Sequence, residues 1–245
     1  MASEGKSIAR GYKLGRCTAC SLPLEGCICP LTPTIHTECQ WWILIHPDES
    51  RKPTNTARLI GATMPQTRFF PWYRTAPPTA LVALLQDRRF MPYLLFPQGD
   101  SCLFACLRER PWLPGRIPAF VLLDGTWSQA RKIFSRSPYL RGLPRMSIQP
   151  QVPSAYTLRR QHCAAHLATV EVAIALLEQI EGPTASSLLR AYFRVFAESC
   201  MAARHGHPPQ PYPPDVVQLL QQNRQHHHPA HHLSPCPTGE GEAAT

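Results

Sequence analysis

Residues 119–134 read AFVLLDGTWSQARKIF, and in this segment an apolar run ends in an acid and a turn before a helical pattern begins. The apolar run is typical of a strand that is buried on both faces, as in a parallel α/β sheet. Asp124 is the first polar residue after it, and Gly125 permits a tight reversal. Thr126 and Gln129 have capping-box spacing, which predicts that a helix starts here. Open α/β sheets bind ligands at such strand ends, and an ordinary strand-turn-helix with a solvated Asp-Gly turn is the competing interpretation.

The alternation of strands and helices continues on both sides of this segment. Apolar runs predict further strands at 40–46, 67–72, 92–96 and 145–148, and a short helix is expected from Cys102. Two longer helices are expected near the end, separated by Gly182-Pro183. The predicted fold class is therefore α/β, a mostly parallel sheet with flanking helices over residues 40–204.

Composition narrows the classes of protein that are compatible with this chain. Its 245 residues are 44% hydrophobic, which is enough to fill a core. Lys and Arg number 25 against 16 Asp and Glu, a formal charge of +9, so we expect a nucleic-acid partner, with generic basicity as the alternative. No run approaches the ~20 apolar residues that cross a bilayer, and the opening residues lack the apolar region of a secretory signal. We expect a cytoplasmic protein without a membrane partner, and the composition predicts no oligomeric state.

Both ends of the chain differ from its middle. Residues 1–15 are expected to be a flexible amino terminus. From 205 to 245 the composition changes to Pro, Gln and His, with too few apolar residues to bury a core. The second segment is predicted to be a disordered tail.

Four cysteines gather in residues 16–39. Cys17 and Cys20 form a C-x2-C pair, and Cys27 and Cys29 form a C-x-C pair six residues later. Four thiolates that surround one ion without an open position are typical of structural zinc, which would order a segment too short to fold alone. A redox pair and an iron–sulfur cluster are the competing interpretations. We expect a four-cysteine zinc knuckle.

Polar side chains also follow other predicted strands. His46 closes the first strand, and it is either a catalytic base or a hydrogen-bonded structural residue. Glu49 follows in the next loop, and Asn55 and Thr56 precede a short helix. Residues 97–101 are predicted to form another polar loop after the third strand. Several strand ends therefore contribute polar groups to a shared cleft.

These motifs together resemble those of the DTW-domain proteins, bacterial tRNA-uridine aminocarboxypropyltransferases. The resemblance spans Arg16 to about Arg204 and rests on a set of short motifs in the right order. They are the four-cysteine knuckle, His46-Pro47-x-Glu49, Asn55-Thr56, Asp124-Gly125-Thr126-Trp127, Tyr156-x-Leu158-Arg159 and Thr169-x-Glu171. The resemblance implies a fold similar to SPOUT methyltransferases with a knotted carboxyl-terminal region. It also implies S-adenosylmethionine as the donor of an aminocarboxypropyl group to N3 of a tRNA uridine.

The resemblance and the strand-end positions together suggest roles for individual residues. Asp124, Thr126 and Trp127 are the catalytic candidates: Asp124 takes or orients the N3 proton or, alternatively, binds the donor ammonium. The amides of Thr126 and Trp127 are expected to hold the donor carboxylate, and the Trp127 ring either packs in the core or stacks on a base. The donor-binding candidates are Pro97, Gly99, Asp100, Ser101, Leu123, Gly125, Tyr156, Thr169 and Glu171. The candidate RNA contacts are Arg131, Lys132, Arg136, Arg159 and Arg160, with His46, Glu49, Asn55 and Thr56 as further site residues.

Two other functions remain compatible with the motifs. A SPOUT-type RNA methyltransferase would use the same donor but transfer its methyl group. A non-catalytic RNA-binding protein with a zinc knuckle would neither bind nor consume the donor.

Overall fold

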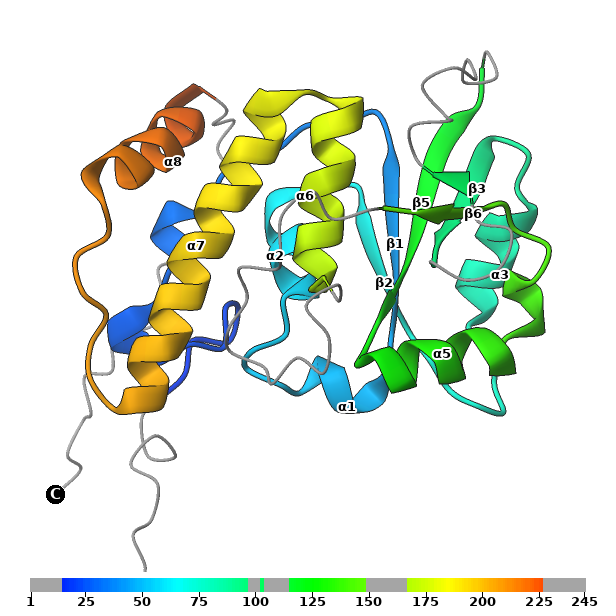
Figure 1. Ribbon diagram of the computed structural model, residues 1–245, viewed down its shortest axis with the longest axis horizontal. Coiled ribbons are helices and arrows are strands. Elements are labelled where there is room, and N and C mark those ends of the chain that lie inside the picture. The colour runs from blue at the N-terminus through cyan, green and yellow to red at the C-terminus, as the bar shows by residue number, and fades with distance from the viewer. Residues whose placement is uncertain (1–14, 97–101, 104–114, 149–166, 227–245) are drawn as a thin grey trace, which may run out of the picture.

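The computed structural model describes residues 15–96, 102–103, 115–148 and 167–226 (Figure 1). Within these residues, six strands form one parallel sheet in the order β2-β1-β5-β3-β6-β4. The strands are β1 (Gln40–Ile45), β2 (Thr67–Pro71), β3 (Phe90–Leu95), β4 (Cys102–Leu103), β5 (Ile117–Asp124) and β6 (Arg145–Ser147). The α/β fold and the parallel sheet are confirmed, whereas the described residues do not by themselves show a knot.

One local prediction is wrong. The expected helix from Cys102 is instead the short edge strand β4, in which Cys102 lies opposite Met146 of β6. A pairing partner from a distant part of the chain decides this conformation, and such a partner cannot be recognised from local periodicity.

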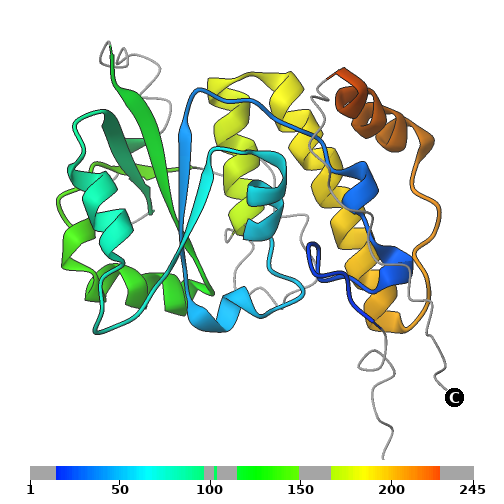
Figure 2. The same cartoon turned by 180° about the vertical axis from the view of Figure 1, so that it is seen from behind.

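Helices cover both faces of the sheet, as the two opposite views show (Figures 1 and 2). One face carries α2 (Ala57–Thr63), α6 (Thr169–Ile180) and α7 (Pro183–His205), and the other carries α3 (Thr79–Gln86) and α5 (Trp127–Arg136). The short helix α1 (Pro47–Ser50) lies at one end of the sheet, and α8 (Pro214–His226) packs beside α7.

Alternating side chains on the central strands divide the core into two layers. On β1, Trp41 and Ile43 pack toward α6 and α7, and Trp42 packs on the opposite face. On the neighbouring β5, Phe120 joins the first layer and Val121 the second. Because both faces are covered, the two strands read as continuous apolar runs, and their polar residues come only at the ends.

The prediction of a disordered tail is wrong for residues 214–226, which form α8. Val216 and Leu220 lie one helical turn apart and are buried, Leu220 completely. The side chain of Asn223 accepts a hydrogen bond from the amide of Thr34 at 3.0 Å. A single buried turn of apolar residues is therefore enough to fix this helix on the protein, although its surroundings are rich in Gln and His.

The amino-terminal cysteine segment does not form a separate unit. Its buried residues Cys17, Cys20 and Ile28 belong to the same apolar cluster as Tyr192 and Phe196 of α7. The hydroxyls of Thr32 and Tyr192 lie 2.8 Å apart and form a hydrogen bond between the two segments. The segment therefore shares the main core with the sheet and its helices.

None of the helices in the described ranges is both long and apolar enough to cross a membrane.

Candidate functional site

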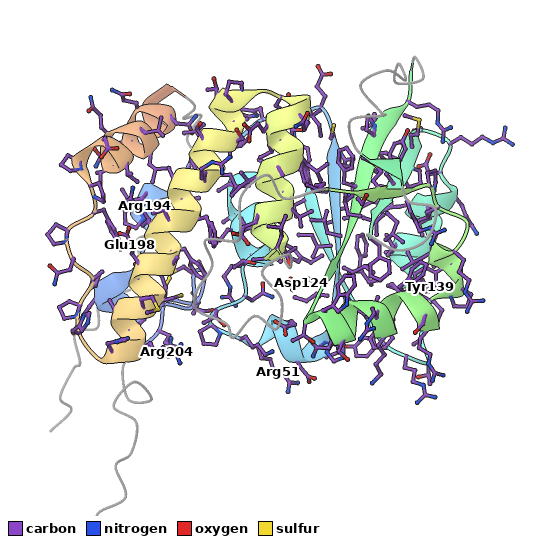
Figure 3. All side chains as sticks on the ribbon, viewed as in Figure 1. Arg51, Asp124, Tyr139, Arg194, Glu198 and Arg204 are labelled. Atoms are coloured by element: carbon purple, nitrogen blue, oxygen red, sulfur yellow. The ribbon has the colours of Figure 1, made fainter. Side chains whose placement is uncertain are left out.

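Asp124 lies at the carboxyl end of the central strand β5 and is only 3% exposed. Its Oδ2 accepts a hydrogen bond from Nδ2 of Asn55 at 2.5 Å, and its Oδ1 accepts one from the hydroxyl of Thr169 at 2.6 Å. Figure 3 shows Asp124 between the start of α6 and α1. Three segments that are far apart in the sequence, and that each carry one of the short motifs, therefore meet at one buried carboxylate.

Asn55 is oriented by the residues around it. The amide of Arg58 donates to Oδ1 of Asn55 at 3.3 Å, so the nitrogen of the side-chain amide is the atom that faces Asp124. Asn55 is 2% exposed, and its own amide donates to the carbonyl of Lys52 at 3.0 Å. Thr56, also buried, is the residue before the first turn of α2.

The predicted capping box is present at the start of α5. The amide of Gln129 donates to the Thr126 hydroxyl at 3.3 Å, and Oε1 of Gln129 accepts from the Thr126 amide at 2.7 Å. The Thr126 amide, which is expected to hold the donor carboxylate, is bonded to Gln129 inside the capping box in this structure.

Gly125 is needed for space rather than for an unusual backbone angle. Its φ is not positive, and a Cβ atom at this position would come within 2.9 Å of Cβ of Gln129. A side chain here would push Gln129 out of the capping box. The reason for glycine at this turn is thus the close approach of the next helical turn.

His46 is built into the structure by several contacts. Its Nδ1 accepts a hydrogen bond from the amide of Asp48 at 3.3 Å, which caps α1, and its ring stacks on Trp72 with centroids 5.6 Å apart. Nε2 of Gln129 lies 3.3 Å from the same Nδ1 and 3.5 Å from Oδ2 of Asp48. The amide of His46 also donates to the carbonyl of Asp124 at 2.9 Å. The structural interpretation of His46 therefore agrees with its contacts.

Glu49 is completely buried on α1. Its Oε1 lies 2.6 Å from Nζ of Lys52, whose side chain is 41% exposed. A buried carboxylate needs such a partner, because its removal from water is costly. The pair closes the loop that leads from α1 to Asn55.

Trp127 is half-buried and contributes to an aromatic stack at the edge of the site. Its ring stacks on Phe96 at 5.4 Å between centroids, and Phe96 stacks on Phe134 at 4.7 Å. The guanidinium of Arg131 lies 5.9 Å from the centre of the Trp127 ring. Trp127 thus packs against the core on one side and lies beside the exposed guanidinium of Arg131.

Thr169 and Glu171 have partners within the protein at the start of α6. The Thr169 hydroxyl is bonded to Asp124, and Oε2 of Glu171 accepts from the amide of Ala168 at 2.7 Å. Leu123, also expected near the donor, is half-buried and packs with the layer around α5. Thr169 therefore binds the Asp124 carboxylate, and Glu171 caps the start of α6.

Three predicted RNA contacts share the exposed side of one helix. Arg131, Lys132 and Arg136 lie on α5, and none of them has a carboxylate partner within the part of the chain that the structure describes. The remaining predicted site residues lie outside that part. They are Pro97, Gly99, Asp100, Ser101, Tyr156, Arg159 and Arg160.

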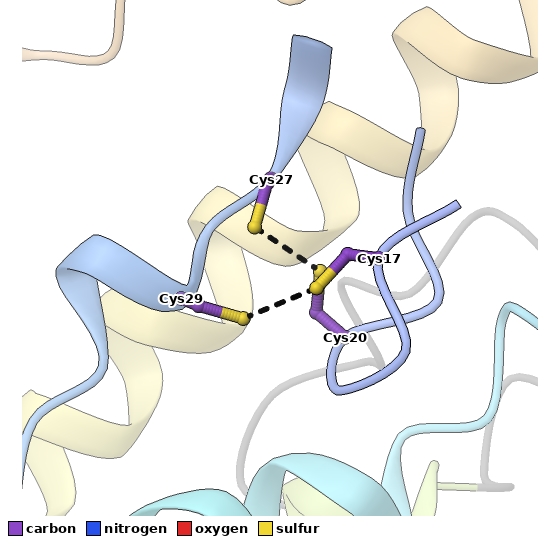
Figure 4. A group of neighbouring side chains, drawn as sticks. All are labelled: Cys17, Cys20, Cys27 and Cys29. Atoms are coloured by element: carbon purple, nitrogen blue, oxygen red, sulfur yellow. Dashed lines mark hydrogen bonds between the residues drawn. The ribbon is translucent and has the colours of Figure 1, made fainter. Parts of the chain in front are cut away.

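The four cysteines of the amino-terminal segment converge on one point (Figure 4). Their Sγ atoms all lie within 4.8 Å of one another, with Cys17 and Cys29 3.6 Å apart and Cys20 and Cys27 3.8 Å apart. None of the four forms a disulfide bond within the described residues. Tetrahedral zinc with Zn–S bonds of ~2.3 Å separates its sulfurs by about 3.8 Å, so the donor set and its size fit that ion.

Burial favours the protonated form of the clustered thiols when no cation is bound. Burial raises the pKa of Cys20, Cys27 and Cys29 above that of an ordinary thiol, and the charge of Cys20 adds to the rise at Cys29. A bound cation reverses this preference, because it coordinates the thiolate form. Cys39 lies outside the cluster and is buried.

Sequence reasoning missed two residues that organise the site. Gln129 was expected only to cap a helix, yet its side chain also reaches His46 and Asp48. The sequence predicts only a short helix after Thr56, yet the side chain of Arg58 in that helix donates to two carbonyl groups of the loop before it. An arginine two residues after a predicted helix cap was the only available signal, and it does not identify a partner.

Comparison with known proteins gives one family. The family model described as the DTW domain matches residues 14–201. No solved structure matches the chain.

Relatives named tRNA-uridine aminocarboxypropyltransferase 2 come from three animals. The protein of Macaca fascicularis is 29% identical over 176 residues, which are 66% of this chain and 56% of the relative. The protein of Mus musculus is 26% identical over 185 residues, 71% of this chain and 60% of the relative. The protein of Drosophila melanogaster is 29% identical over 175 residues, which are 68% of this chain and 66% of the relative. The chain thus spans less than two thirds of the length of these relatives.

Proposed function

Since the chain belongs to the DTW-domain family, we propose that it transfers the 3-amino-3-carboxypropyl group of S-adenosylmethionine to N3 of a uridine in tRNA. The relatives' names support this activity. The observation that carries the proposal is the meeting of Asn55, Asp124 and Thr169 at the carboxyl end of the parallel sheet, where open α/β sheets bind their ligands.

The proposed reaction needs a proton acceptor near the uracil. A carbon–sulfur bond of the sulfonium breaks, a carbon–nitrogen bond to N3 forms, and methylthioadenosine leaves as a neutral thioether. N3 loses its proton in the process and is a poor nucleophile until that proton is shared or removed. Because each carbon on the sulfonium is electrophilic, the orientation of the donor selects the aminocarboxypropyl group over the methyl group.

Asp124 is the residue that we propose for the N3 proton. Asn55 can only donate through Nδ2, so Oδ2 of Asp124 carries no proton in this arrangement and acts as an acceptor. The two donors from Asn55 and Thr169 fix the carboxylate in one orientation without adding an opposite charge. A carboxylate that is fixed in advance does not have to reorganise during the reaction.

The donor is proposed to lie beside the start of α5. In the described residues, Leu123, Gly125 and the Trp127 ring border this region, and the polar loop at 97–101 and the residue Tyr156 complete the proposed site. Trp127 is suited to an apolar contact, because it is already held against Phe96. From α6, Thr169 supports the site by its hydrogen bond to Asp124, and Glu171 supports it by capping the start of the helix.

The tRNA is proposed to contact the cationic face of α5. Arg131, Lys132 and Arg136 are exposed there and have no carboxylate partner in the described ranges. Arg159 and Arg160 are proposed as additional phosphate contacts. Because binding through phosphates releases counterions, the affinity for tRNA should fall steeply as salt is added.

Three further features belong to the proposal. The cysteine cluster holds zinc as a structural ion, which its sulfur spacing supports. The fold is SPOUT-like with a knotted carboxyl-terminal region, in agreement with the parallel sheet. The cytoplasm is its proposed compartment, because reduced thiols and a tRNA substrate occur there.

The proposed activity is tested by mass spectrometry of the nucleosides of unmodified tRNA after incubation with the purified protein and S-adenosylmethionine. We expect uridine with an added aminocarboxypropyl group, and we expect Asp124→Asn to abolish it while donor binding is retained. Asp87→Asn is the matched control, because this partly exposed acid pairs with Arg89 away from the site.

Each other outcome has a defined meaning. A product that carries only a methyl group would identify an RNA methyltransferase. If the protein neither binds nor consumes the donor, it is an RNA-binding protein without this activity. If Asp124→Asn loses donor affinity first, Asp124 binds the donor ammonium instead of serving the N3 proton.

A further inference from the structure

Arg58, the second residue of α2, donates hydrogen bonds through one side chain to three acceptors in two separate parts of the chain. Its Nη1 donates to the hydroxyl of Ser21. Its Nη2 donates to the carbonyl of Lys52 at 2.8 Å, and its Nε donates to the carbonyl of Asn55 at 3.1 Å. The planar guanidinium offers donors in fixed directions, so the three acceptors are held relative to one another.

The first of these acceptors belongs to the cysteine knuckle. Ser21 follows Cys20 directly and has a φ of 62°, which is rare for a residue other than glycine. Its amide donates to the carbonyl of Cys17 at 2.8 Å, so its position depends on the turn that joins the two cysteines. An ion bound by Cys17 and Cys20 therefore fixes the Ser21 hydroxyl as well.

The other two acceptors belong to the loop that orients Asp124. The carbonyls of Lys52 and Asn55 are the two ends of one turn, which is closed by the bond from the Asn55 amide to the Lys52 carbonyl. Arg58 also orients the Asn55 side chain, because its backbone amide donates to Oδ1. Asn55 in turn donates to Asp124. A continuous series of hydrogen bonds thus runs from the knuckle to the buried carboxylate.

We propose that Arg58 is a positioning residue that couples the cysteine knuckle to Asp124. With the knuckle folded around its ion, Ser21 and Arg58 hold the loop at 52–55, and Asn55 faces Asp124. When the knuckle opens, the guanidinium loses its contact with Ser21 and the loop is freed to move. The consequence for turnover rests on the proposed function, whereas the coupling between knuckle and loop does not.

Hydrogen–deuterium exchange of the zinc-loaded protein tests the coupling without reference to activity. In Arg58→Lys, with zinc content equal to that of the wild type, exchange in residues 51–56 should become about tenfold faster, while β5 (Ile117–Asp124) should stay unchanged. Lysine keeps the charge but cannot reach three acceptors in different directions. Arg68→Lys is the matched control, because Arg68 is exposed on β2 and its side chain forms no hydrogen bond or ion pair within the described residues.

The dependence on the knuckle is measured in the same experiment. Removal of zinc from the wild type by a chelator should speed exchange in residues 51–56 as well as in residues 15–30. In Arg58→Lys, removal of zinc should accelerate exchange in residues 51–56 only a little further. Unchanged exchange in residues 51–56, in the zinc-loaded lysine variant or in the chelated wild type, overturns the proposal. Equal acceleration in β5 would show general unfolding and would also overturn it.

A kinetic cycle then tests whether Arg58 acts through Asn55. We expect Arg58→Lys to lower kcat for tRNA modification about tenfold with the KM for S-adenosylmethionine unchanged. In an Asn55→Ala background the same change should have no further effect, because the intermediate residue is gone. Additive effects contradict the route through Asn55. If the wild type modifies no tRNA, the proposed function fails, but the exchange experiment still decides the coupling.

Discussion

Thr169 at the start of α6 donates its hydroxyl to Oδ1 of Asp124 at the end of β5, at a distance of 2.6 Å. The two residues are 45 positions apart, and the bond joins the central strand to a helix on one face of the sheet. It also occupies one oxygen of the carboxylate that we place at the centre of the reaction. The hydroxyl of Thr169 is therefore a part of the site and not only of the helix end.

Thr169→Val should lower the rate of tRNA modification by about 10- to 100-fold, because a hydrogen bond to a carboxylate is lost at constant side-chain volume. Thr169→Ser keeps the hydroxyl and should retain most of the activity. Single-turnover kinetics with saturating donor measure both variants. Equal rates for valine and serine would contradict a role of this hydroxyl in the site.

The side chain of Gln129 caps α5 and also reaches His46, and substitutions at this position can separate these two roles. Gln129→Glu keeps an acceptor for the Thr126 amide and places an acid in the first helical turn, but it removes the donor to His46. We expect Gln129→Glu to keep the melting temperature and to lose activity. Gln129→Ala should lose activity and should also lower the free energy of unfolding by about 1 kcal/mol. Thermal unfolding and turnover of the two variants decide this, and full activity of Gln129→Glu would exclude a need for the link to His46.

Leu220→Ala should destabilise the protein by about 2–5 kcal/mol, because Leu220 of α8 is completely buried. Leu219→Ala is the control on the adjacent position, which is 37% exposed, and should change the free energy of unfolding by less than about 0.5 kcal/mol. Urea unfolding of the whole chain measures both values. Similar effects of the two variants would show that α8 does not pack as described.

The cysteine cluster is expected to hold zinc in the purified protein at a ratio of about one ion per chain. Cys29→Ser should remove the zinc and lower the melting temperature by roughly 10 °C, since each kcal/mol corresponds to about 2–4 °C in a chain of this size. Cys39→Ser is the matched control, because Cys39 is buried but lies outside the cluster. Elemental analysis should find full zinc content in the control, and loss of zinc there would reassign the ligands.

Cys39 should make the protein less stable at high pH. Burial raises the pKa of its thiol to about 12, whereas an unfolded thiol titrates near pH 8.5. Between these two values the unfolded chain has lost a proton that the folded chain still holds. The contribution to stability is therefore complete below about pH 8.5 and decreases as the pH rises toward 12, with a slope of at most ~1.4 kcal/mol per pH unit.

Urea unfolding at pH 8 and pH 10 measures this effect. In Cys39→Ala the free energy of unfolding should fall less between these two pH values than in the wild type. Equal slopes in both proteins would show that Cys39 is not protected from ionisation in the folded state.

Local residue patterns were enough to predict the central strand, the turn and the capping box. A run that is apolar on both faces, an acid, a glycine and Thr126 with Gln129 act over a few neighbouring positions, and the structure has the same elements there. The cluster of four thiols was also predictable, because closely spaced cysteines are brought together by short loops. The spacing of neighbouring residues decides these features.

Contacts over long distances in the chain were not predictable in this way. The helix α8 depends on the burial of Leu220, and β4 depends on its pairing with β6. In each case local propensity left several conformations open, and a partner elsewhere in the fold selected one of them.

The sequence by itself therefore determined the type of fold, the cluster of four cysteines and the position of Asp124 at a strand end. Only the tertiary structure decided that Asn55 and Thr169 bind the two oxygens of this carboxylate and that Arg58 joins the loop of Asn55 to the knuckle. The physical reason is that strand and helix patterns follow from neighbouring residues, whereas a buried carboxylate takes its partners from whichever segments the packing of the sheet and its helices brings to it.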